Sequence, residues 1–160
     1  KEERRKLRIE IVRIVADILK EWKIFIKPHP LLKISTEVRS LFTSISEQIV
    51  ITEPEEPTDV YIEVADLIID LPRSASTTVY TALIQSQQTP ILSIDIDGEF
   101  CGDGYKNFNG IEYISSKENF INTLELIKNG KYTKMKCDVI MSRSNKYIYP
   151  DIGKLFQALL

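Results

Sequence analysis

Apolar and polar positions alternate along the chain with two different periods, and the changes of period predict where helices and strands lie. Residues 2–22 carry apolar side chains three and four positions apart with charges between them, which indicates an amphipathic helix. Residues 23–27 are β-rich and stop before Pro28, as a strand would. The same reasoning predicts helices over residues 35–45, 59–64, 74–87 and 117–128, and strands over residues 49–51, 66–71, 90–96 and 111–114.

The predicted strands are apolar on both faces and alternate with helices, which implies a parallel sheet covered by helices on both sides. The expected fold class is therefore α/β, with a three-layer αβα, Rossmann-like, doubly wound parallel sheet. Residues 1–160 contain no repeat or long linker and are expected to form one domain, with a loop over 130–144 and a terminal helix over 152–160. The expected N-caps are Ser35 or Thr36, Asp59, and Ser115 or Ser116.

Charge and composition exclude some classes of binding partner and of cellular location. Lys and Arg number 21 against 23 Asp and Glu, so the net charge of -2 gives no overall field that would attract nucleic acid. No apolar run approaches the roughly 18 residues that cross a bilayer, and no signal peptide opens the chain. We therefore expect no transmembrane segment and a cytoplasmic protein, with Cys101 and Cys137 as reduced thiols.

The first candidate site follows the strand over residues 23–27. Ligands of open parallel sheets bind beyond the carboxyl ends of the strands. Here His29, the only histidine, stands between Pro28 and Pro30, which restrict the backbone on either side. Its imidazole suits a phosphate or a sugar hydroxyl, and Lys27 adds a point charge. The alternative is a loop histidine with a structural hydrogen bond.

The second candidate site lies between the strand over 66–71 and the helix that follows it. A helix start offers free backbone N–H groups and a partial positive charge, which favour an anion. Hydroxyl donors and one guanidinium accompany this helix start: Arg73, Ser74, Ser76, Thr77 and Thr78. Ser74 or Ser76 could equally be only the N-cap of the helix, and capping is compatible with ligand binding.

The sequence gives less support for a metal site or a dinucleotide site than for the two candidate sites above. Asp95 and Asp97 end a strand and could hold a divalent cation, but Asp97-Gly98 is also a common turn pair, and we favour the turn. One histidine excludes a multi-histidine site, and neither GxGxxG nor GxxxxGK[ST] occurs. We therefore expect no bound metal and no nicotinamide cofactor.

The order of these features resembles the carboxyl-terminal, donor-binding half of GT-B fold glycosyltransferases, in particular those of bacterial surface and capsular polysaccharide synthesis. The resemblance spans about residues 2–97 and begins with the amphipathic helix. It rests on IKPHP at residues 26–30, VADLIID at 64–70, SASTT at 74–78 and TPIL at 89–92. The Lys-Pro-His-Pro run is the most specific of these motifs. A Glu-x7-Glu motif, present in another GT-B branch, has no counterpart.

The resemblance implies a nucleotide-activated sugar as donor substrate and no separate cofactor. His29 and Pro30 would shape the nucleotide site, while Ser74, Ser76 and Thr77 would bind phosphate. The catalytic base and the acceptor glycan would belong to an amino-terminal domain, so the chain is expected to be one half of a two-domain enzyme and inactive alone. The full-length enzyme could lie on the inner face of the membrane.

Two other interpretations stay open. A nucleotide-sugar epimerase-like enzyme half would use related loops, but it needs further acid and base residues near the sugar. A non-catalytic α/β module that binds a ligand or a partner protein would use Pro-His-Pro only as a rigid turn, and fold alone does not exclude it.

Overall fold

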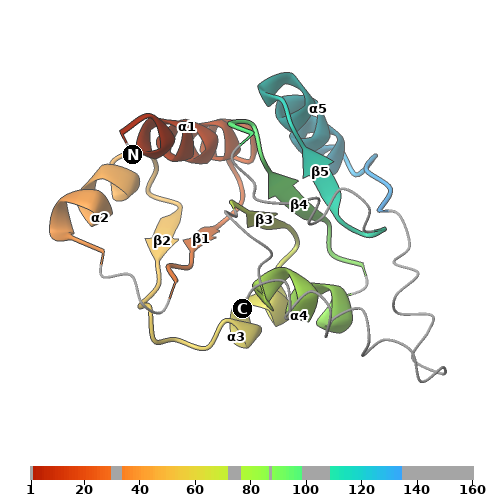
Figure 1. Ribbon diagram of the computed structural model, residues 1–160, viewed down its shortest axis with the longest axis horizontal. Coiled ribbons are helices and arrows are strands. Elements are labelled where there is room, and N and C mark those ends of the chain that lie inside the picture. Colours follow the sequence, from red (N-terminus) through yellow and green to blue (C-terminus); the bar gives the residue numbers. More distant parts are fainter. Residues whose placement is uncertain (1, 30–33, 72–76, 87, 99–108, 135–160) are drawn as a thin grey trace.

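Helices and short strands alternate in the computed structural model, which describes residues 2–29, 34–71, 77–86, 88–98 and 109–134. Figure 1 shows the elements in the order α1 (Glu2–Ile18), β1 (Ile24–Ile26), α2 (Thr36–Thr43), β2 (Ile49–Ile51), α3 (Asp59–Val64), β3 (Ile68–Asp70), α4 (Thr77–Gln85), β4 (Ile91–Ile94), β5 (Glu112–Ile114) and α5 (Lys117–Lys128). None of the helices in these ranges has the length and apolar composition needed to cross a lipid bilayer.

The strands form two small parallel sheets. β1 pairs with β2, with Ile24 opposite Ile49, and β3, β4 and β5 pair in that order. Asp70 lies opposite Ser93 in the larger sheet. The α/β class and the parallel pairing predicted from the sequence are confirmed, and the hydrogen bonds divide the strands between two sheets.

Two core clusters lie on opposite faces of the three-stranded sheet. Ile91 of β4 packs with side chains of α3 and α4, whereas Leu92 and Ile94 pack with side chains of α1 and α5. Because successive strand residues point to opposite faces, helices cover both faces of this sheet, as Figure 1 also shows. Ile24 of β1 packs against the α1–α5 cluster too, so the two sheets share a core.

Some element boundaries differ from the sequence prediction. α1 ends at Ile18, and residues 19–22 form a turn in which the Trp22 backbone N–H donates to the Leu19 carbonyl. Leu19 and Trp22 still pack in the core, which is why their spacing resembled a longer helix. Asp59 is the first residue of α3 and not its cap, a position that Thr58 takes.

The N-caps of α2 and α5 are serines that the sequence predicted as candidates. Ser35 accepts from the backbone N–H of Val38 at the start of α2, and Ser116 accepts from that of Asn119 at the start of α5. Each bond satisfies one of the backbone donors that a helix start leaves free. These caps confirm the starts predicted for both helices to within two residues.

Candidate functional site

Lys27 follows β1 and holds the loop that follows β2. Its Nζ lies 3.2 Å from the Pro28 carbonyl oxygen, 3.3 Å from that of Glu53 and 2.7 Å from that of Pro54. An ammonium group has three donors, and these three carbonyls can use them all. Lys27 therefore joins the carboxyl ends of β1 and β2, where we had expected it to supply a charge for phosphate.

Arg39 of α2 bonds both the end of β2 and the loop that follows it. Its Nη1 donates to the Ile51 carbonyl at 3.3 Å, and its Nη2 lies 2.8 Å from a carboxylate oxygen of Glu53. The Thr52 backbone N–H also donates to the Ile26 carbonyl across the strand pair, at 3.1 Å. These bonds fix the edge of the sheet from which residues 27–29 leave.

Replacing Lys27 by methionine should reduce the free energy of unfolding by about 1–3 kcal/mol, because part-buried carbonyls lose their donor. Methionine keeps an unbranched stem of similar length, so little packing changes. Urea unfolding of the Lys27→Met and Lys20→Met variants would measure the difference, since Lys20 is exposed in the turn after α1. Equal destabilisation by the two changes would contradict this role of Lys27.

The other residues of the two candidate sites are only partly within the described ranges. His29 is exposed just beyond the carboxyl end of β1 and makes a contact within the chain. Thr77 is the first residue of α4, and Thr78 is half-buried in its first turn. Pro30, Arg73, Ser74 and Ser76 lie outside the described residues. A helix follows β3, as the sequence predicted, although α4 spans Thr77–Gln85 where a helix over residues 74–87 was expected.

A polar row crosses the three-stranded sheet near its carboxyl edge. Asp70, Ser93 and Tyr113 are register neighbours on β3, β4 and β5, so their side chains share one face. Ile91 precedes Ser93 by two residues and packs against α3 and α4, so the row faces these helices. The Tyr113 hydroxyl donates to the Asp95 carboxylate.

Two polar atoms of this row are buried without a hydrogen bond. Within the described residues, neither Oδ2 of Asp70 nor the hydroxyl of the fully buried Ser93 has a partner. Burial raises the pKa of Asp70 to about 7, so this carboxyl can be neutral or ionised near neutral pH. Burial and the bond to Asp95 raise the pKa of Tyr113 to about 12, which keeps it a hydroxyl donor.

Asp95 and Asp97 do not form a pair. Asp95 bonds Tyr113, whereas Asp97 contacts Arg4 of α1. The backbone between them turns, since Gly98 has a φ of 66° and its N–H donates to the Asp95 carbonyl. The turn favoured from the sequence is therefore confirmed. The described ranges also hold no group of three or more side chains of the kind that bind a metal ion.

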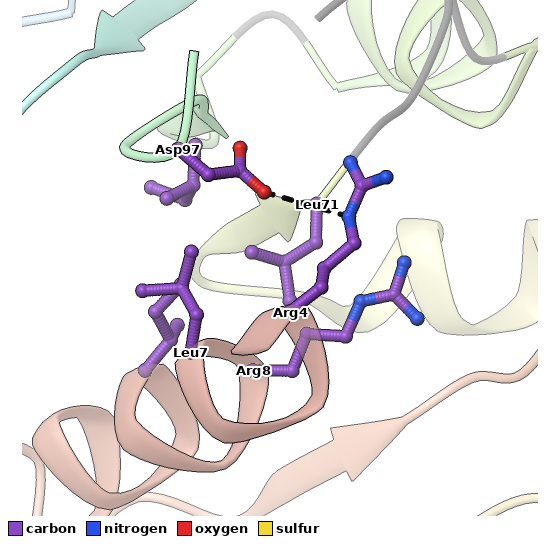
Figure 2. A pocket seen from close by; sticks show the side chains of 7 residues that line it. Arg4, Leu7, Arg8, Leu71 and Asp97 are labelled. Atoms are coloured by element: carbon purple, nitrogen blue, oxygen red, sulfur yellow. Dashed lines mark ion pairs between the residues drawn. The ribbon is translucent and has the colours of Figure 1, made fainter. Parts of the chain in front are cut away.

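A small hollow lies where α1 crosses the carboxyl ends of β3 and β4. Figure 2 shows Arg4 and Arg8 extending from α1, with Arg4 passing Leu71 toward Asp97. Arg4 Nε lies 3.5 Å from an oxygen of Asp97. The hollow has a volume of about 10 Å³, which is the space of about one water molecule. It is too small for a nucleotide, and the ion pair holds α1 against this edge.

No family model, curated protein or solved structure matches the chain. Evidence on the function therefore comes from the geometry and from the motifs in the sequence.

Sequence reasoning missed Asp70 and the pair Arg4 and Arg8. Asp70 ends an apolar strand, and a lone acid in that position is a signal that could have marked it as a perturbed carboxyl. The two arginines are four residues apart in α1 and therefore share a helix face, but so do many solvent-exposed charges. Their place at the sheet edge depends on how α1 packs.

Proposed function

We propose that this chain is the nucleotide-sugar donor-binding half of a glycosyltransferase, with a Rossmann-like, doubly wound arrangement in which β1 and β3 are neighbours. The observation that supports the proposal is the pairing of the strands. β1 is paired with β2 and β3 is paired with β4, in separate sheets that share the α1–α5 core. In open α/β folds, ligands bind at the point where strand order reverses, and in the proposed arrangement that point lies between β1 and β3.

Two polar segments follow β1 and β3 in the chain. Lys27 and His29 come after β1, and the hydroxyl-rich segment 74–78 leads into α4 after β3. The nine residues of α4 give a helix start whose free N–H groups and partial positive charge favour phosphate oxygens. The three carbonyl contacts of Lys27 support a rigid frame for His29, since a fixed backbone lowers the entropy lost when a ligand is bound.

In this proposal the chain binds and orients the donor and does not itself activate the acceptor. The helix start and the serine and threonine hydroxyls would bind the diphosphate, which is also the leaving group when the sugar is transferred. Charge that develops on a leaving phosphate is stabilised by donors that are already in place. His29 and Pro30 would contact the nucleoside.

Titration of the chain with CMP, CDP and UDP, followed by calorimetry, tests the proposal. We expect saturable binding, tighter for the diphosphates than for CMP. His29→Ala and Ser76→Ala should each weaken binding by roughly five- to tenfold, because each removes one hydrogen bond to the ligand. Asn122→Ala, an exposed change on α5, should have no effect. Saturable binding that is unchanged by both site substitutions would remove the assigned site.

A non-catalytic partner-binding module is the second candidate. It is favoured by the exposed apolar side chains of α3, since Val60 and Val64 both lie open to solvent on one side of that helix. If the titration shows no nucleotide binding, that result would favour this candidate over the first. Nothing in the geometry gives similar support to an epimerase-like enzyme half.

A further inference from the structure

Two arginines of α1 lie at the carboxyl edge of the three-stranded sheet. Arg4 and Arg8 are one helical turn apart and therefore share a side of α1. Both line the hollow of Figure 2, together with Leu71, which directly follows β3, and Ile94, the last residue of β4. β3 and β4 are parallel, and ligands of open α/β folds bind beyond the carboxyl ends of such strands.

The apolar lining of the hollow orients the two arginine side chains. Leu7 and Ile11 of α1 contribute to this lining, and long arginine stems can lie along apolar surface while their charged ends stay in polar surroundings. The Arg4 side chain is 14% exposed and Arg8 is half-buried. Figure 2 shows both side chains extending from α1 in the same direction. Side chains held in this way lose less conformational entropy when a ligand binds.

A carboxylate of the chain already lies against one of the two guanidinium groups. An oxygen of Asp97 lies 3.5 Å from Nε of Arg4, and the Asp97 side chain is 25% exposed. Asp97 belongs to the turn in which the Gly98 N–H donates to the Asp95 carbonyl. An ion pair that solvent reaches contributes little stability, so another anion can compete with it. The position of Asp97 shows that this place accepts an oxyanion.

The charges around the hollow favour an anion with more than one negative charge. Its charged lining residues are two arginines and one aspartate. Like charges four residues apart on a helix repel each other, and an anion that contacts both offsets this repulsion. The planar guanidinium group binds phosphate oxygens through two hydrogen bonds at once. The hollow holds about 10 Å³, so such an anion would contact the guanidinium groups at its rim.

We propose that Arg4 and Arg8 bind a phosphate or diphosphate group at the rim of this hollow, and that the anion displaces the Asp97 carboxylate from Arg4. Leu71 and Ile94 pack in the cluster with α1 and α5, so the site lies on that side of the sheet. α4, whose start is the proposed phosphate site for the sugar donor, covers the opposite side. The inference therefore does not depend on the proposed function.

Calorimetric titration of the full chain with inorganic pyrophosphate tests the site. We expect saturable binding that Arg8→Gln weakens by about tenfold, because the change removes a charge-assisted hydrogen bond to the anion. Arg5→Gln is the matched control, since it removes the same charge from an exposed position of α1 outside the hollow. Salt screens a charge that does not contact the anion, so this control should change the affinity by less than about twofold.

Asp97→Asn should change the affinity in the opposite direction. The substitution keeps the shape of the side chain and removes the competing charge, so pyrophosphate should bind about two- to fivefold more tightly. If Asp97→Asn weakens pyrophosphate binding or leaves it unchanged, the Arg4–Asp97 ion pair is only structural and the proposal is overturned. Equal losses of affinity for Arg5→Gln and Arg8→Gln, or the absence of saturable binding, would also overturn it.

Competition between pyrophosphate and UDP identifies the source of the anion. If UDP displaces pyrophosphate and loses affinity in the Arg8→Gln variant, the site takes the phosphates of a nucleotide. If pyrophosphate binds equally well to the chain saturated with UDP, the site takes a separate oxyanion, and both results support the site. Pyrophosphate that binds as described while UDP does not bind would contradict the proposed function and leave this site in place.

Discussion

The Asp70→Asn variant should gain stability over the unchanged protein as the pH rises from about 4 to about 8. Burial raises the pKa of Asp70 to about 7, above the value near 3.9 of an unfolded chain. Between these values the folded state holds a proton that the unfolded state has released, so the free energy of unfolding of the unchanged protein falls as pH rises. At 1.36 kcal/mol for each pH unit, the loss reaches at most about 4 kcal/mol.

Urea unfolding at intervals of one pH unit would measure this difference. At each pH, the unfolding free energy of the unchanged protein is subtracted from that of the variant. This difference cancels the contribution of carboxyls whose effect on stability has the opposite sign, such as Glu56, whose pKa is lowered by the bond from Tyr61. Asp66→Asn is the matched control, because Asp66 is an exposed acid four residues before Asp70. If the curves of the Asp70→Asn variant and the unchanged protein run parallel across this pH range, Asp70 is not a buried, unpaired carboxyl.

Phe120→Ala should have an effect of similar size and is expected to cost about 3–5 kcal/mol of stability. Phe120 is fully buried in the cluster that joins α1, α5, β4 and the end of β5, and it is among the largest such side chains in the described residues. Its loss would leave a cavity between these elements, since packed cores collapse only in part. The melting temperature should fall by roughly 10 °C for a chain of this length.

Leu126→Ala provides the control on the same helix. Leu126 is exposed, so removing its side chain should change stability by only about 0.5 kcal/mol. Scanning calorimetry of the two variants would separate core packing from any change in the helix propensity of α5. Similar losses of stability for the two variants would mean that α5 does not pack through Phe120 as described.

Most secondary structure followed from local patterns, as the cap residues illustrate. Ser35 and Ser116 could be recognised as N-caps because each is a hydroxyl residue directly before a segment with helical apolar spacing. Each side chain accepts from a backbone N–H only three residues later, so the interaction is local. The end of α1 was wrong by four residues, because Leu19 and Trp22 keep a helical spacing while burying their side chains from a turn. The spacing of apolar residues shows which side chains are buried, but it does not show whether their backbone is a helix or a turn.

The candidate site was predicted less completely than the fold. Its expected place at the carboxyl ends of β1 and β3 rests on parallel topology, which the apolar strands indicate. The use of Lys27 to bind three carbonyls was not predictable, since two of those carbonyls come from a loop 26 and 27 residues away. For the same reason, the pairing of Arg4 with Asp97 joins positions that nothing in the local sequence connects.

The sequence by itself determined the order of helices and strands, the parallel α/β class and the two polar segments that follow β1 and β3. These depend on side-chain period and turn chemistry over a few residues. Only the tertiary structure decided that Asp70 and Ser93 meet on one face with unpaired buried atoms, and that Val60 and Val64 of α3 are left exposed. Strand register and helix packing set those environments, and both arise from contacts between segments far apart in the chain.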